Sequence, residues 1–156
     1  MKKNLITSLL VSLVMLIGCF AIPLSASAAD DKTTSTVEYL DDGSYIVTTL
    51  TLPDGLTRSS KSASKTVTAY NANDNALWAY TVTATFTYDG KTSKCTSVSD
   101  SYSIYDNNWY MASHSCTKDG NLASGTATAK KKVLGVVVDT MTKTVRISCN
   151  QYGNIV

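Results

Sequence analysis

One pair of residues could supply a nucleophile and its base. His114 is the single histidine of the 156-residue chain, and Cys116 follows it by two positions. Residues i and i+2 of a strand point to the same face, so the imidazole and the thiol could lie close together. A nucleophilic thiol also needs a base that a third group holds, and no Asn or Asp stands in a recognisable arrangement with this pair. We therefore expect a protein that is not an enzyme.

Metal and carboxylate chemistry have little support. The sequence has no C-x-x-C, no H-E-x-x-H and no twelve-residue calcium loop, so we expect no metal and no cofactor. It also lacks G-x-S-x-G and a phosphate-binding glycine loop. Five of the eleven aspartates lie in turn sequences, where turn geometry alone explains them. These are Asp42, Asp54, Asp89, Asp106 and Asp119.

Three cysteines remain after the N-terminal segment, namely Cys95, Cys116 and Cys149. An odd number in an oxidising compartment suggests one disulfide and one free thiol. Strand periodicity turns Cys95 and Cys149 toward the core, and the sequence therefore predicts a Cys95–Cys149 bridge. The alternative is a bridge between Cys95 and Cys116 on neighbouring strands, and Cys116 is otherwise free or forms intermolecular dimers.

Tyrosines and lysines supply the candidate contact surfaces. Tyr102, Tyr105 and Tyr110 flank a turn sequence and could form a platform on which sugars stack, although tyrosine is also a common strand residue that packs. The run Lys130–Lys132 could contact an anionic cell-wall polymer or lipid headgroups. Lysines at a strand end more often protect an edge from pairing.

The N-terminus has the pattern of an export signal. Lys2 and Lys3 precede an apolar run over residues 5–22, and Ala26-Ser27-Ala28 presents small residues where a signal peptidase cleaves. We expect residues 1–28 to be a signal peptide and the protein to be secreted, with no transmembrane span after cleavage. The alternative is a lipoprotein, because residues 16–19 match a lipidation box ending at Cys19.

The charge of the mature chain excludes one class of partner. The net charge of +2 comes from Lys2 and Lys3, so basic and acidic residues are equal in number beyond the signal. A neutral chain without a basic face gives no electrostatic reason to bind nucleic acid.

Apolar and hydroxyl side chains alternate along most of the mature chain, which indicates strands. Residues 29–52 read as a hairpin with its turn at Gly43, and residues 53–65 as a Ser/Lys-rich linker. Residues 66–156 then form the main domain, where Asp89-Gly90 predicts a two-residue turn that pairs Ala84 with Cys95. The fold expected is all-β, a small antiparallel β-sandwich or barrel-like sheet with an N-terminal hairpin.

Several segments carry a likeness to known proteins. They are residues 42–49, 76–78, 82–88, 95–97, 104–105 with Trp109, and 149–154. With these segments the chain resembles a widespread, uncharacterised group of small secreted proteins of Gram-positive anaerobic bacteria. The resemblance covers nearly the whole mature chain, and His114 and Cys116 are local additions to its pattern. It implies export and an all-β domain, and it supplies no activity and no site residues.

The sequence thus predicts a secreted, non-catalytic interaction module of the extracellular space or the cell envelope. Its expected partner is a cell-wall glycan or an envelope protein. The alternative is a bacteriocin-like secreted antagonist, against which the near-zero charge counts, since membrane-attacking peptides are usually cationic and amphipathic.

Overall fold

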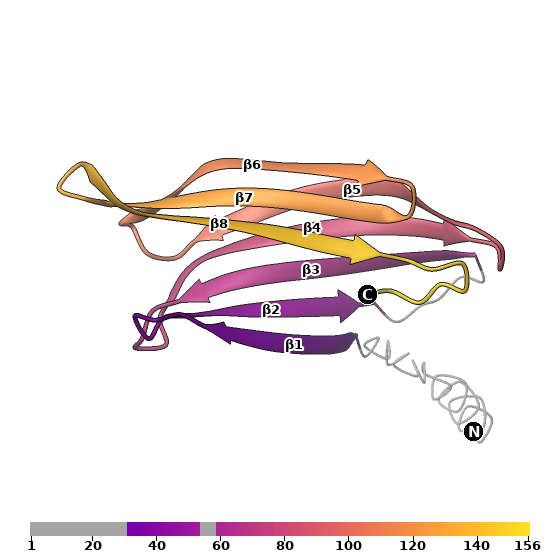
Figure 1. The fold of residues 1–156 in the computed structure, drawn as a ribbon, viewed down its shortest axis with the longest axis horizontal. Helices are drawn as coiled ribbons and strands as arrows, with labels where there is room; N and C mark the ends of the chain where they lie inside the picture. The colour runs from indigo at the N-terminus through magenta and orange to yellow at the C-terminus, as the bar shows by residue number, and fades with distance from the viewer. Residues whose placement is uncertain (1–30, 54–58) are drawn as a thin grey trace, which may run out of the picture.

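The computed structural model describes residues 31–53 and 59–156, and these contain eight strands and no helix (Figure 1). The signal peptide predicted for residues 1–28 and the lipidation box at Cys19 lie outside the described residues. No described segment forms a helix long and apolar enough to cross a membrane. The strands are β1 (Lys32–Tyr39), β2 (Tyr45–Leu52), β3 (Ser60–Tyr70), β4 (Ala76–Tyr88), β5 (Ser93–Ile104), β6 (Trp109–Asp119), β7 (Leu122–Val133) and β8 (Val136–Ser148).

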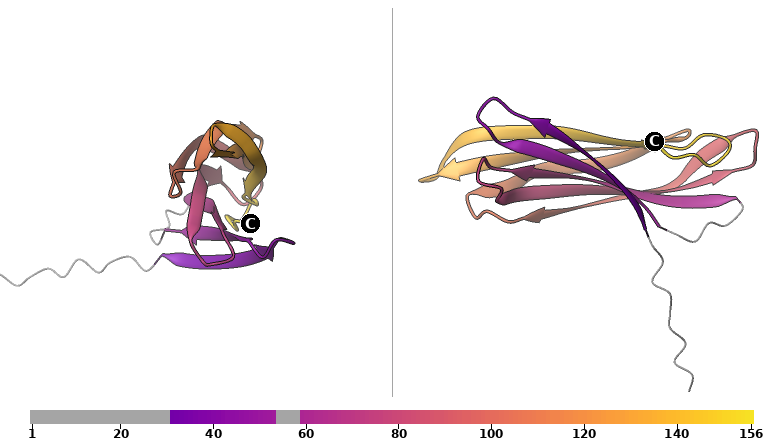
Figure 2. Two further views of the ribbon diagram at one scale, coloured as in Figure 1. Left: turned by 90° about the vertical axis from the view of Figure 1, so that its left-hand side faces the viewer. Right: turned by 90° about the horizontal axis from the view of Figure 1, so that it is seen from below.

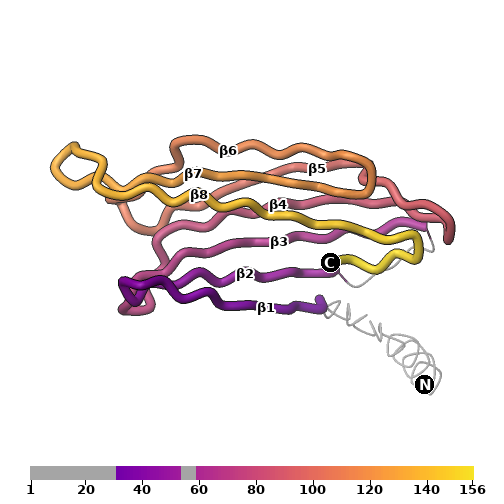
Figure 3. Tube along the Cα trace, in the orientation of Figure 1, coloured from indigo at the N-terminus to yellow at the C-terminus, as the bar shows by residue number. Residues whose placement is uncertain are grey.

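The strands form two antiparallel sheets that pack face to face. One sheet has the order β1-β2-β3-β4-β5 and the other the order β6-β7-β8. Within each sheet, strands that are consecutive in the chain pair with each other. The larger sheet is twisted, and β1 and β2 cross the strands of the smaller sheet at an angle (Figure 2). The trace in Figure 3 shows the β7–β8 hairpin extending beyond the other turns at its end of the molecule. The predicted all-β antiparallel sandwich is confirmed.

The linker expected at residues 53–65 is wrong from residue 60 onward. Strand β3 begins at Ser60, and the side chain of Ala63 is fully buried. Strand β3 pairs with β2 on one side and with β4 on the other, so residues 29–52 supply two strands of the main sheet rather than a separate hairpin. The outward serines are typical of a linker, which is why this part of the strand was not predicted. In the structure, Ser62 and Ser64 lie opposite threonines of β4 and form hydroxyl–hydroxyl hydrogen bonds with them.

The turn after β4 is longer than the sequence predicted. The Asp89 carboxylate accepts hydrogen bonds from two backbone N–H groups, one of them Thr92 at 2.7 Å, and this closes a four-residue connection. Cys95 therefore lies opposite Phe86 instead of Ala84. The error is a shift of two residues, and because the side-chain period of a strand is two, Cys95 still faces the core.

The core joins large side chains of β4 to small residues of β7. The β4 side chains Trp78, Tyr80 and Phe86 are fully buried, as their alternation predicted. Facing them, β7 presents three alanines and a glycine, so the two sheets approach closely at this point. These small residues are Ala123, Gly125, Ala127 and Ala129.

A substitution at Gly125 tests the close approach of β7 to β4. A Cβ atom at Gly125 would overlap the Tyr80 hydroxyl and the Val82 side chain. We expect Gly125→Ala to lower the free energy of unfolding by about 2 kcal/mol, the usual cost of overpacking a core, as measured by urea denaturation. The matched control Ser124→Thr adds a methyl group to the preceding residue of β7, which points to the outer face. It should change the stability by less than about 0.5 kcal/mol. Equal stability of Gly125→Ala and the wild type would contradict this packing.

Candidate functional site

A polar cluster lies at the junction of the sheets, centred on Asp100 of β5. One oxygen of Asp100, Oδ2, lies 2.9 Å from the Tyr80 hydroxyl and 2.9 Å from His114 Nδ1. The Tyr80 oxygen also lies 3.1 Å from the Ser115 carbonyl oxygen. Because His114 and Ser115 belong to β6 and Tyr80 and Asp100 to the larger sheet, the cluster ties the two sheets together.

The cluster corrects one expectation from the sequence, since an aspartate does contact His114. The order of the groups differs, however, from that of a catalytic thiol. In such a site the imidazole stands between the thiol and the carboxylate, whereas here Asp100 interacts with both His114 and the Cys116 thiol. Burial and the Asp100 charge raise the pKa of Cys116, so its thiol stays protonated at neutral pH.

Opposing effects act on the Asp100 carboxyl. Burial raises its pKa, but hydrogen bonds from His114 and Tyr80 stabilise the carboxylate and more than compensate, so the pKa of Asp100 is below its ordinary value. Burial, together with the hydrogen bond to Asp100, raises the pKa of Tyr80. At neutral pH, Tyr80 is thus a neutral donor and Asp100 a charged acceptor.

The three tyrosines predicted as a ligand surface have different neighbours. The Tyr102 ring lies 5.0 Å from the His114 imidazole, between centroids. The Tyr110 ring lies under the Lys132 ammonium, 4.5 Å from its centroid to Nζ. Tyr105 is exposed in the connection between β5 and β6. Their binding of a ligand stays a prediction.

The structure has Cys95, Cys116 and Cys149 as free thiols, so the expected Cys95–Cys149 bridge is not formed in it. The inward orientation of Cys95 and Cys149 is confirmed, because both are buried. Their backbone N–H groups donate to two adjacent carbonyls of the β6–β7 turn, at 2.8 Å to Gly120 and 3.2 Å to Asn121. The core therefore brings these two cysteines to the same end of the sandwich.

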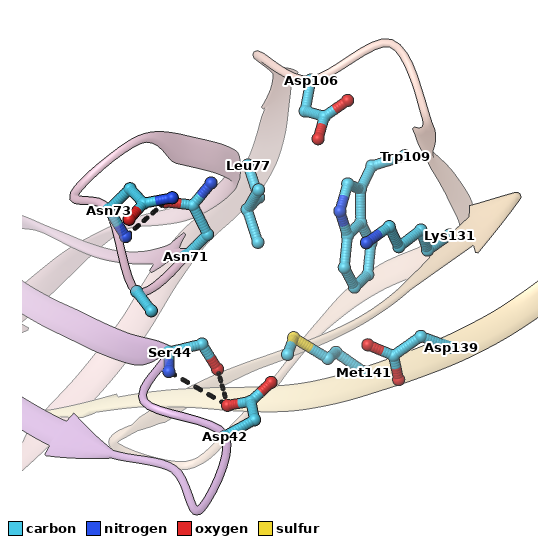
Figure 4. Close-up of a pocket in the computed structure, with 11 residues that line it drawn as sticks. Asp42, Ser44, Asn71, Asn73, Leu77, Asp106, Trp109, Lys131, Asp139 and Met141 are labelled. Atoms are coloured by element: carbon cyan, nitrogen blue, oxygen red, sulfur yellow. Dashed lines mark hydrogen bonds between the residues drawn. The ribbon is translucent and has the colours of Figure 1, made fainter. Parts of the chain in front are cut away.

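A cavity of about 280 Å³ opens at the other end, where the β1–β2, β3–β4 and β5–β6 turns meet the bases of β7 and β8 (Figure 4). Polar groups line most of it. The lining residues are Asp42, Ser44, Asn71, Ala72, Asn73, Leu77, Asp106, Trp109, Lys131, Asp139 and Met141.

The turns themselves bring the carboxylates and amides to the cavity. Asp42 Oδ1 accepts a hydrogen bond from the Ser44 N–H at 3.0 Å, and Asp106 Oδ1 accepts one from the Asn108 N–H at 2.8 Å. Asn71 Oδ1 likewise accepts from two N–H groups of its own turn. Each turn uses one side-chain oxygen, which leaves the second carboxylate oxygen or the amide nitrogen for a ligand.

The cavity also has an apolar wall and an uncompensated charge. Trp109 is buried, and its Nε1 lacks a hydrogen-bond partner within the described part of the chain. In Figure 4 the indole forms one wall, with its Nε1 edge turned toward Leu77. Three carboxylates face a single ammonium, that of Lys131, so the cavity is negatively charged overall. The hydrogen bonds of Ser44, followed by the Lys131 charge, lower the pKa of Asp42, which keeps it ionised.

This arrangement does not suit a metal ion, because no group of three or more metal-ligating side chains comes together in residues 31–53 and 59–156. It suits a small organic ligand instead. Separated carboxylates and amides can accept from and donate to several polar groups of one molecule, and the Trp109 wall can pack on its carbon atoms. From the sequence, Asp42 and Asp106 are turn residues, and no local pattern indicates that their turns meet.

Comparison of the chain with protein-family models, with curated proteins and with solved structures finds no match.

The Asp100 cluster makes stability depend on pH. A carboxyl group whose pKa is lower in the folded state stabilises the fold when the pH is above its unfolded-state pKa of about 3.9. This stabilisation is lost as the pH falls through the pKa of the folded state. We expect Asp100→Asn to lower the free energy of unfolding by about 1 kcal/mol at pH 7 and to have a much smaller effect at pH 3, as measured by urea denaturation. The control Asp119→Asn, in an exposed turn, should change stability little at either pH. An equal loss for Asp100→Asn at both pH values would contradict the charge assignment.

Proposed function

We propose that this protein is a non-catalytic binding module of the extracellular space or the cell envelope. Its ligand is rich in hydroxyl groups and carries an amino group, as the amino sugars of a cell-wall glycan do. The observation that carries the proposal is the cavity at Trp109, with Asp42, Asp106 and Asp139 around it. An ammonium group compensates the excess negative charge, while Asn71 and the remaining carboxylate oxygens bind hydroxyls.

The state of the Cys116 thiol supports binding over catalysis. The Cys116 thiol has a raised pKa. The Asp100 carboxylate interacts with both this thiol and His114, so the imidazole does not act as a base for the thiol. Two of the three cavity carboxylates, Asp42 and Asp106, are engaged in turn hydrogen bonds, which suits fixed recognition. We propose that the protein reaches its ligand by export through residues 1–28, and that Cys95 and Cys149 form a disulfide after export. Lipidation at Cys19 stays the alternative route to the cell surface.

Titration with defined sugars tests this proposal. Isothermal titration with a glucosamine pentamer should show binding, and the N-acetylated pentamer should bind at least tenfold more weakly, because acetylation removes the charge. Asp139→Asn and Asp106→Asn should each weaken binding of the glucosamine pentamer about tenfold, the effect of one charge-assisted hydrogen bond. Asparagine at position 106 keeps the oxygen that closes the turn, so the local fold is preserved.

The control is Asp119→Asn, which removes a carboxylate from the β6–β7 turn at the opposite end of the sandwich (Figure 1). This variant should bind the glucosamine pentamer like the wild type. Equal affinity for the two pentamers, or no binding of either, would overturn the proposed ligand.

A further inference from the structure

The β7–β8 hairpin ends in a group of large apolar side chains that the described residues leave exposed. Leu134 at the turn is fully exposed, and the valines beside it expose 43 to 63% of their surface. We call this group the apolar tip. It consists of Val133, Leu134, Val136, Val137 and Val138. In Figures 1 and 3 this hairpin projects past the neighbouring turns, so no other strand covers it.

The backbone at the apolar tip holds Leu134 in a conformation that is unfavourable for leucine. Leu134 has φ 50° and Gly135 has φ 83°, both in the left-handed region. Two-residue hairpin turns of this kind favour Asn, Asp or Gly at the first position, because a branched apolar side chain is strained there. Strained residues of this type concentrate at functional sites. Leu134 thus has a conformational cost and packs against nothing in residues 31–53 and 59–156.

The apolar tip presents apolar groups on both faces of a two-stranded ribbon. Neighbouring strand residues point to opposite faces, yet Val136, Val137 and Val138 are all exposed. A flat protein surface would cover one face and leave the other in water. Fluid acyl chains, in contrast, surround a projecting ribbon on every side. The occupant that fits this shape is therefore lipid.

The base of the hairpin has the groups that favour a membrane interface. Lys131 and Asp139 face each other in the ladder, about three residues below the turn, so the apolar tip rises about 10 Å above them. Interfacial segments bury their apolar face by 5 to 10 Å. Lys132, which pairs with Val137 one step nearer the turn, extends its ammonium over the Tyr110 ring, and tyrosine and lysine are both enriched where hydrocarbon meets water.

The charges near the base are mixed. Lys130, Lys131 and Lys132 lie on β7. Asp139 of β8 lies opposite Lys131, and Asp42 and Asp106 line the adjacent cavity. The lysines therefore raise the affinity for anionic lipids only modestly, and the apolar tip supplies most of the affinity for the membrane.

From these observations we propose that the apolar tip inserts into the outer leaflet of a lipid bilayer and holds the sandwich at the membrane by its cavity-bearing end. The proposal is independent of the ligand that the cavity binds. It adds to the fold a reversible membrane contact that requires no spanning segment.

Vesicle flotation tests the insertion. The exported protein is purified from culture medium, its N-terminus is read by mass spectrometry, and it is floated with vesicles of phosphatidylcholine alone or with phosphatidylglycerol. We expect the wild type to float with both. Leu134→Asn should reduce the bound fraction more than tenfold, because it removes the most exposed apolar side chain. Asparagine is preferred in this turn, so this variant should be at least as stable as the wild type.

Two further variants make the test specific. Val37→Thr, on the exposed edge strand β1, is the matched control and should float like the wild type. Lys132→Gln should bind phosphatidylglycerol vesicles about fivefold less and phosphatidylcholine vesicles equally, since a lysine near an anionic surface contributes roughly this factor.

Three results would overturn the insertion. They are a wild type that does not float, a Leu134→Asn variant that floats like the wild type, and a wild-type dimer in light scattering that Leu134→Asn converts to a monomer without any flotation. The last result would assign the apolar tip to a second copy of this chain. The Leu134→Asn variant should still bind the glucosamine pentamer, so a failure of insertion and a failure of the proposed ligand are separate outcomes.

Discussion

The structure depends on how closely β7 approaches β4. A strand with alanine and glycine at its inward positions lets the aromatic side chains of the facing strand fill the space between the sheets. At Gly125 there is no room for a Cβ atom beside Tyr80 and Val82. This packing also fixes the Tyr80 hydroxyl beside Asp100 and β6, so the apolar core and the polar junction between the sheets are parts of one arrangement.

The outer faces of the sheets are held by hydroxyl pairs. Cross-strand neighbours such as Thr66 and Thr81, or Thr128 and Thr142, lie within 3.0 Å of each other through their hydroxyl oxygens. These pairs contribute to strand register without charge, because a hydroxyl can donate and accept at the same time. They explain why a chain so rich in Ser and Thr folds as sheets.

Local patterns predicted the local parts of this fold. The alternation of Trp78, Tyr80 and Phe86 with hydroxyl residues identified β4 and its buried face, and Gly43 identified the first turn, where its φ is 80°. The first half of β3 was predicted as linker because Lys61 and Lys65 share the inward face with Ala63, and the outward residues are serines, so no apolar alternation marks a strand there. The register after Asp89 was wrong because a side-chain hydrogen bond, which periodicity does not encode, lengthened the turn.

The sites were harder to predict because they combine distant residues. His114 was recognised as chemically notable, but its partner Asp100 lies 14 positions away in the other sheet, and nothing in the spacing pairs them. The cavity joins three turns whose aspartates each have a sufficient local explanation. The run Val136–Val138 indicates a strand, but a run of valines does not reveal whether a second sheet covers it.

Native-state hydrogen exchange tests the central packing most directly. If the fit of β7 against β4 holds the two sheets as one unit, the slowest amides of both strands exchange only through global unfolding, with the same free energy of opening. The account predicts this equality for β4 and β7, together with fast exchange near Leu134 at the tip of the projecting hairpin. Exchange of the β6-β7-β8 sheet at a free energy several kcal/mol lower, while β3 and β4 stay protected, would contradict it.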